Sequence, residues 1–113
     1  MLNRRVEPRM LCADTVDVRW EDQETGRSRR VMANLDDISR FGACLILDCP
    51  LPVKASLRIA HSRGELTGKV IYCVLREVGY VTGVEFEPGS SWSPENYQPE
   101  HLYDPRSPED RTE

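Results

Sequence analysis

The chain has 113 residues, with 15 Lys and Arg against 19 Asp and Glu, which gives a formal net charge of −4. This length accommodates one compact domain, and the composition, 39% hydrophobic and 30% charged, is typical of a globular protein rather than a membrane or collagen-like chain. No apolar run approaches the roughly 18–20 residues that span a bilayer, and the start, MLNRRVEPR, lacks a signal-peptide core. We therefore expect a cytoplasmic protein without membrane insertion. The acidic balance disfavours general DNA or RNA binding, which needs a basic surface.

The predicted elements are short strands. Residues 16–20 and 31–35 alternate between apolar and polar side chains and, with the turn at 22–26 between them, predict a hairpin. Residues 42–47 (GACLIL) are nearly all apolar, which is typical of a strand covered on both faces. Three further strands are predicted at 56–60, 66–75 and 80–87.

Six such strands, with no helical periodicity before Pro88, predict an all-β domain. A small, closed antiparallel barrel hides its strand edges better than an open sheet does. We therefore expect three parts in the chain: an arginine-bearing arm at 1–9, a six-stranded β-barrel at 10–87 and a tail at 88–113.

The tail differs in composition from the barrel, because residues 88–113 hold five of the eight prolines, two basic residues and six acidic ones. Prolines exclude a long helix or a central strand, so at most a short helix is expected, beginning at Ser93-Pro94. Beyond about Asp104 we expect disorder. The first part of the tail is expected to be held on the barrel by Trp92, Tyr97, Leu102 and Tyr103.

Neither the cysteines nor the histidines suggest chemistry. No C-x-x-C pair occurs, and His61 and His101 are not at zinc-like spacings from any cysteine, so we expect no metal site. The carboxylates Glu85 and Glu87 share one strand face without an opposing acid, and no phosphate-binding glycine loop is present. We expect neither catalysis nor a cofactor. We expect all four cysteines to be free thiols that pack as small hydrophobic side chains: Cys12, Cys44, Cys49 and Cys73.

An arginine motif, R-x-x-x-R, precedes the first strand and consists of Arg5 and Arg9, with Arg4 immediately before it. Pro8 prevents an ordinary helix here, so the segment is expected to be an extended or turning arm. Guanidinium groups bind phosphate oxygens in bidentate fashion and hydrogen-bond to guanine. The alternative is a solvated basic terminus.

A second motif, D-x-S-x-x-G, joins the second predicted strand to the third and consists of Asp37, Ser39 and Gly42. A carboxylate can accept hydrogen bonds from the N1–H and exocyclic amine of a guanine, and glycine lets a flat base approach the backbone. The alternative is a plain structured turn, in which Asp and Ser bond to local backbone.

Together, these two motifs and the final Gly83-Val84-Glu85-Phe86 make residues 4–87 resemble a PilZ domain. The resemblance implies a six-stranded barrel that binds the bacterial second messenger cyclic di-GMP. Within it, Arg5 and Arg9 would bind phosphates and guanine. In PilZ domains an arginine at the position of Arg4 accompanies capture of an intercalated dimer of the ligand, so the resemblance implies a third contact from Arg4. The residues that would hold a guanine on the barrel are Asp37, Ser39 and Gly42.

The leading hypothesis is a cyclic di-GMP receptor or adaptor in bacterial signalling, whose arm orders over the ligand and so alters the binding of an unidentified protein partner. The alternative is a PilZ-like protein–protein interaction module that binds no nucleotide. An oligonucleotide-binding barrel is less favoured, because residues 1–87 hold 13 basic and 13 acidic residues and only 7% of the chain is aromatic.

Overall fold

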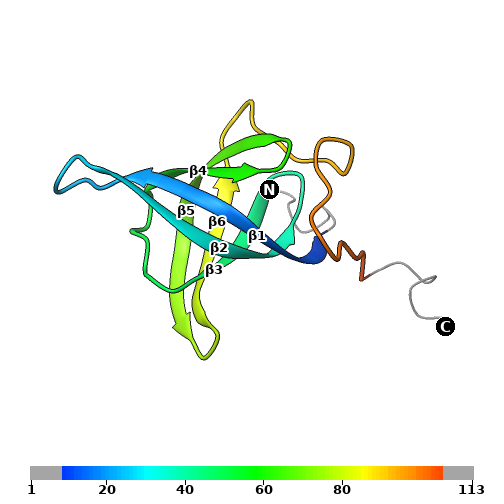
Figure 1. Ribbon diagram of the computed structural model, residues 1–113, viewed down its shortest axis with the longest axis horizontal. Helices are drawn as coiled ribbons and strands as arrows, with labels where there is room; N and C mark the ends of the chain where they lie inside the picture. The colour runs from blue at the N-terminus through cyan, green and yellow to red at the C-terminus, as the bar shows by residue number, and fades with distance from the viewer. Residues whose placement is uncertain (1–8, 106–113) are drawn as a thin grey trace, which may run out of the picture.

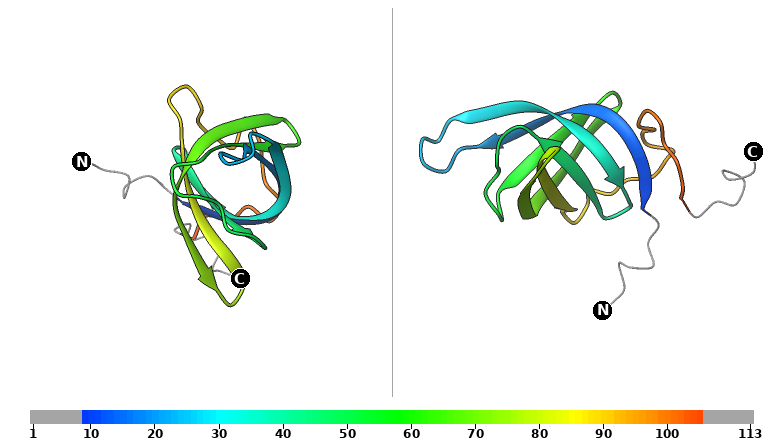
Figure 2. Two further views of the ribbon diagram at one scale, coloured as in Figure 1. Left: turned by 90° about the vertical axis from the view of Figure 1, so that its left-hand side faces the viewer. Right: turned by 90° about the horizontal axis from the view of Figure 1, so that it is seen from below.

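The computed structural model describes residues 9–105, and within this range six antiparallel strands close into a barrel (Figure 1). The order of neighbours around the barrel is β1-β2-β3-β6-β5-β4, and pairing of β4 with β1 completes the circle (Figure 2). The predicted all-β barrel is therefore confirmed. The strands are β1 (Met10–Glu21), β2 (Ser28–Ile38), β3 (Gly42–Leu47), β4 (Ser56–His61), β5 (Gly64–Arg76) and β6 (Gly79–Phe86).

The alternating pattern of the sequence defines the inside of the barrel. In β1, for example, Val16 and Val18 are buried, whereas Arg19, the residue after Val18, is exposed. In β3, by contrast, consecutive residues from Ala43 to Leu45 are all buried, as the apolar run predicted. The most deeply buried side chains of the described residues are those of Val16, Val18, Leu35, Ile38, Leu45, Leu47, Ile59, Val70 and Thr82.

Strands β1 and β2 are longer than the sequence pattern predicted. The β1–β2 register shifts between Leu11 and Asp14, and the β2–β3 register shifts between Leu35 and Asp37. Such irregularities break the alternation of apolar and polar side chains from which strands are recognised. As a consequence, Asp37 lies inside β2 rather than in the connection to the next strand.

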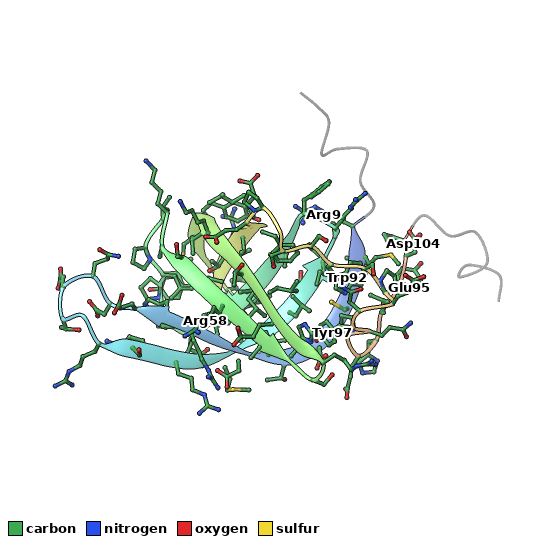
Figure 3. The ribbon with its side chains drawn as sticks, turned by 90° about the horizontal axis from the view of Figure 1, so that it is seen from above. Arg9, Arg58, Trp92, Glu95, Tyr97 and Asp104 are labelled. Carbon is green, nitrogen blue, oxygen red and sulfur yellow. The ribbon has the colours of Figure 1, made fainter. Side chains whose placement is uncertain are left out.

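The segment after β6 returns to the barrel. Trp92 and Tyr97 are buried in the core, as expected, and Leu102 packs against it. The backbones of Leu11 and Tyr103 exchange two hydrogen bonds, of 2.7 and 2.8 Å, so that the segment ends beside the start of β1. Figure 3 shows Trp92 and Tyr97 at the same end of the molecule as Arg9.

The expected short helix is a single turn, in which the Asn96 N–H donates to the Ser93 carbonyl at 3.0 Å. Between residues 9 and 105, no helix is long and apolar enough to cross a membrane. Asp104 and Pro105 are described, whereas the rest of the end for which we expected disorder, 106–113, lies outside the described residues.

Candidate functional site

The structure brings one residue of each sequence motif into direct contact. Arg9, just before β1, donates from Nη1 to Asp37 Oδ1 at 2.6 Å, across 28 positions of sequence. The Arg9 side chain is 58% exposed and that of Asp37 only 16%, so the carboxylate is held and the guanidinium faces solvent. Arg4 and Arg5, the other arginines predicted for this site, lie outside the described residues.

The carboxylate of Asp37 is in a partly desolvated environment. Burial raises the pKa of Asp37, and Asp36 next to it raises that pKa further, while the charge and hydrogen bond of Arg9 oppose both effects. Arg9 thus supplies the positive partner that keeps a poorly hydrated carboxylate in place. Any ligand that displaces Arg9 must offer hydrogen-bond donors of its own.

Ser39 and Gly42 frame the tight connection between β2 and β3. The Ser39 N–H donates to the Gly42 carbonyl at 2.8 Å, and its hydroxyl donates to the same oxygen at 3.4 Å. Ser39 is buried, and its contacts with residues 9–105 are those of a structured turn. Two neighbours fix this turn, because the Phe86 N–H donates to the Phe41 carbonyl and the Trp92 N–H to the Arg40 carbonyl.

Position 42 must be a glycine because the backbones of β3 and β6 approach each other closely there. A Cβ at this position would lie 2.5 Å from the Val84 carbonyl oxygen on β6, a distance that real Cβ atoms do not show. The glycine therefore has a structural role whatever it does for a ligand. Together with Arg9, Ser39 and Gly42 line one cavity, of about 50 Å³, whose wall also includes Ile71 and Glu85. This volume is far below the roughly 300 Å³ of a ligand pocket, so a bound base would sit on the surface or displace Arg9.

Tyr72 belongs to the same surface, although the sequence did not indicate it. Asp37 on β2, Cys44 on β3, Gly83 on β6 and Tyr72 on β5 are consecutive partners across four strands. The Tyr72 ring covers Gly83, and the Tyr72 hydroxyl interacts with the Cys44 side chain. Because 41% of Tyr72 is exposed, its aromatic ring faces solvent next to the Arg9–Asp37 pair.

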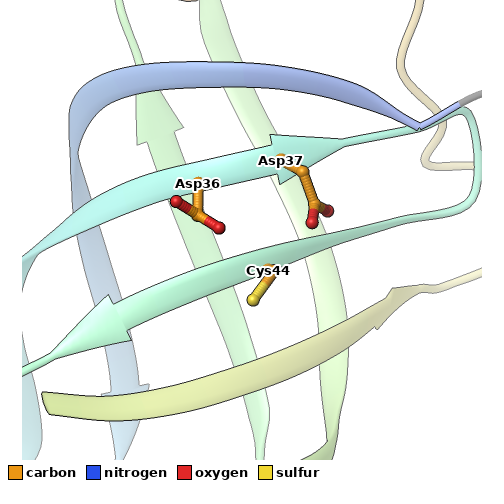
Figure 4. Close-up of side chains that lie close together, drawn as sticks. All are labelled: Asp36, Asp37 and Cys44. Atoms are coloured by element: carbon orange, nitrogen blue, oxygen red, sulfur yellow. The ribbon is translucent and has the colours of Figure 1, made fainter. Parts of the chain in front are cut away.

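Three potential ligand atoms for a metal lie here, on Asp36, Asp37 and Cys44, all within 4.8 Å of one another (Figure 4). Burial raises the pKa of Cys44 to about 11, so the thiol is protonated at neutral pH. Asp37 is already paired with Arg9. The surroundings therefore suit a hydrogen-bonding ligand better than a cation, and we assign no metal.

Comparison with known proteins adds the fold family. No protein-family model matches the chain, and no curated protein matches it in sequence. Its structure is similar to the PilZ domain with c-di-GMP of YcgR from Escherichia coli, with a TM-score of 0.52 and 14% sequence identity. The match covers 78% of this chain and 81% of the other. The chain therefore has the fold of a PilZ domain, as its motifs indicated.

Proposed function

We propose that this protein is a receptor for cyclic di-GMP and not an enzyme. The observation that supports the proposal most directly is the contact between Arg9 and Asp37, which unites the two predicted motifs at one point of a PilZ fold. A guanine offers Asp37 two N–H donors in place of the arginine, and a phosphate offers the arginine two oxygens in place of Asp37. The ligand is thus complementary to both halves of the ion pair.

Binding proceeds, in this proposal, by exchange of partners. The exposed Arg9 guanidinium leaves Asp37 and turns to a phosphate, and the guanine edge takes its place on the carboxylate. The half-exposed Tyr72 ring offers a stacking surface for a purine beside it. Arg4 and Arg5 supply further phosphate and guanine contacts, including those to a second, intercalated ligand molecule.

Calorimetric titration with cyclic di-GMP tests the site. The wild-type protein is expected to bind, and Arg9→Ala and Asp37→Asn are each expected to weaken binding by about tenfold or more, because each loses charge-assisted hydrogen bonds. Arg76→Ala removes an arginine at the far end of β5 and is the matched control. Absence of binding by the wild type contradicts the receptor; binding unchanged in both variants contradicts this site.

The arm is proposed to order over the ligand and so to change the surface offered to a protein partner. Hydrogen exchange measures this directly: backbone amides of residues 4–9 should become protected when cyclic di-GMP is added. Equal protection with and without ligand contradicts the ordering step but leaves the binding site intact.

One observation favours the alternative, a protein–protein interaction module that binds no nucleotide. The contacts of Ser39 and Gly42 are those of a well-packed turn, and no ligand is needed to explain them. The same titration separates the two functions, since a module of this kind gives no heat with cyclic di-GMP.

A further inference from the structure

A second polar surface lies at the other end of β1 and β2, far from the Arg9–Asp37 pair. A groove of about 710 Å³ runs there over β1, β2, β4 and β5. Since a strand rises by about 3.3 Å per residue, Arg30 lies roughly 20–25 Å along β2 from Asp37. Figure 3 shows Arg58, which lines this groove, well separated from Arg9.

Three arginines stand side by side on this surface. Arg19 on β1 is paired with Arg30 on β2 and with Arg58 on β4, so that the three side chains form one row across adjacent strands. All three are exposed. Like charges directly opposite one another destabilise a sheet, so a row of three is unfavourable unless anions compensate it.

The compensation within the described residues is incomplete. A single carboxylate, Asp17, meets both Arg30 Nε at 2.7 Å and Arg19 Nε at 3.5 Å. Arg58 has no ion pair or side-chain hydrogen bond among residues 9–105. The row therefore keeps an excess of positive charge, although residues 10–87 as a whole hold 10 basic and 12 acidic residues.

The residues that line the groove belong to two faces of the sheet. Trp20 follows Arg19 in β1 and pairs with the buried Leu57 of β4, so its ring lies on the face opposite the arginine row, and Arg29 lies over that ring at 6.0 Å from its centroid. Two carboxylates, Glu21 and Glu87, line the groove as well and would repel a long polyanion. A short acidic segment is therefore a better match than a nucleic acid.

We propose that this arginine groove is a docking site for an extended acidic segment of a protein partner. Strands are about 4.8 Å apart, so the outer arginines of the row are roughly 10 Å apart, and alternate residues of an extended peptide are about 6.8 Å apart. Two or three glutamates or aspartates at alternate positions can therefore meet the row, with the intervening side chains turned away from it. The inference goes beyond the nucleotide site and stands independently of it.

Fluorescence anisotropy with a labelled peptide, GSEVEVEVGS, tests the docking site, with GSQVQVQVGS as the uncharged control. The glutamate peptide should bind the full chain and the glutamine peptide should bind about tenfold more weakly. Arg58→Glu should reduce binding of the glutamate peptide by about tenfold, since it replaces attraction by repulsion. Arg76→Glu makes the same change of charge outside the groove and should have little effect.

Each other result overturns the proposal. Equal losses in the two variants would mean that only net charge matters, and no binding of the glutamate peptide would remove the site. Tighter binding of a single-stranded oligodeoxynucleotide of equal charge would make the groove a nucleic-acid surface. Circular dichroism verifies that Arg58→Glu is folded, and its unchanged response to cyclic di-GMP separates failure here from failure of the nucleotide site.

Discussion

Tyr72 and Gly83 face each other across β5 and β6, with the tyrosine ring directly over the glycine. A Cβ built on Gly83 would lie 2.2 Å from ring atom Cε2, so no other residue fits there unless Tyr72 moves. The ring in turn covers Cys44, which is buried although it is on the outer face of β3. One glycine thus determines where the aromatic surface beside Asp37 lies.

Gly83→Ala is expected to displace the Tyr72 ring and to lower the free energy of unfolding by about 1–3 kcal/mol, the usual cost of overpacking. Urea denaturation measures the change. In a Tyr72→Ala background the alanine has room, so the same substitution should cost much less. A penalty of equal size in both backgrounds would show that the ring is not what the new methyl group meets.

Gly42→Ala separates the structural and ligand-binding roles of the second motif. Because the new Cβ would press on the Val84 carbonyl, we expect a loss of about 1–3 kcal/mol in unfolding free energy without any ligand. Thermal and urea unfolding of the ligand-free protein provide the measurement. A fully stable variant that fails to bind cyclic di-GMP would instead assign the glycine to ligand contact alone.

Tyr97→Phe tests how the C-terminal segment is attached. The Tyr97 hydroxyl donates to Asp14 Oδ2 at 2.5 Å, and the only other hydrogen bond recorded to this oxygen among residues 9–105 is a longer one, of 3.3 Å, from the Glu100 N–H. Losing the phenolic hydroxyl should lower the unfolding free energy by about 1 kcal/mol, because the partly buried Asp14 carboxylate loses its stronger donor. Tyr80→Phe removes a hydroxyl that has no hydrogen bond to residues 9–105 and should change stability little. Equal effects of the two substitutions would contradict the role of Asp14.

The affinity for cyclic di-GMP should fall on acidification. The fall should begin at a higher pH than it would if Asp37 had the pKa of an ordinary aspartate. Only the ionised Asp37 can accept both guanine donors, and burial raises its pKa above the usual 3.8. Protonation of the free protein therefore competes with binding as the pH falls through this raised pKa. Calorimetry over a pH series measures the effect, and Asp37→Asn should bind weakly with little of this dependence. If the wild-type affinity stayed constant until the pH reached the ordinary pKa of an aspartate, 3.8, the proposed role of Asp37 would be contradicted.

The fold was predictable because its signals are local. Alternation in residues 16–20 and 31–35 and the apolar run at 42–47 indicate strands without reference to the rest of the chain. The start of β1 and the end of β2 were not predictable, because shifts of register between Leu11 and Asp14 and between Leu35 and Asp37 hide the alternation. Strand extent thus depends on pairing partners that no short window contains.

The same distinction applies to the site. Asp37, Ser39 and Gly42 lie close together in sequence and were predicted, but Tyr72 was not. Its position opposite Gly83 depends on the shift of register after Val70, which a sequence pattern does not reveal. The row of Arg19, Arg30 and Arg58 was hidden for the same reason, since each residue alone resembles any exposed charge on a strand.

The backbone pairing of Leu11 with Tyr103 has a practical consequence for protein engineering. Leu11 is two residues after Arg9, and Tyr103 is two residues before Pro105, where the described chain ends. The pairing therefore places both ends of the described chain near the proposed nucleotide site. Fluorescent proteins joined to the chain before the arginine arm and after Pro105 would therefore be tethered to neighbouring points of the barrel, and a rearrangement of the arm would change their separation or orientation. This geometry suits an energy-transfer biosensor whose signal reports ligand binding in living cells.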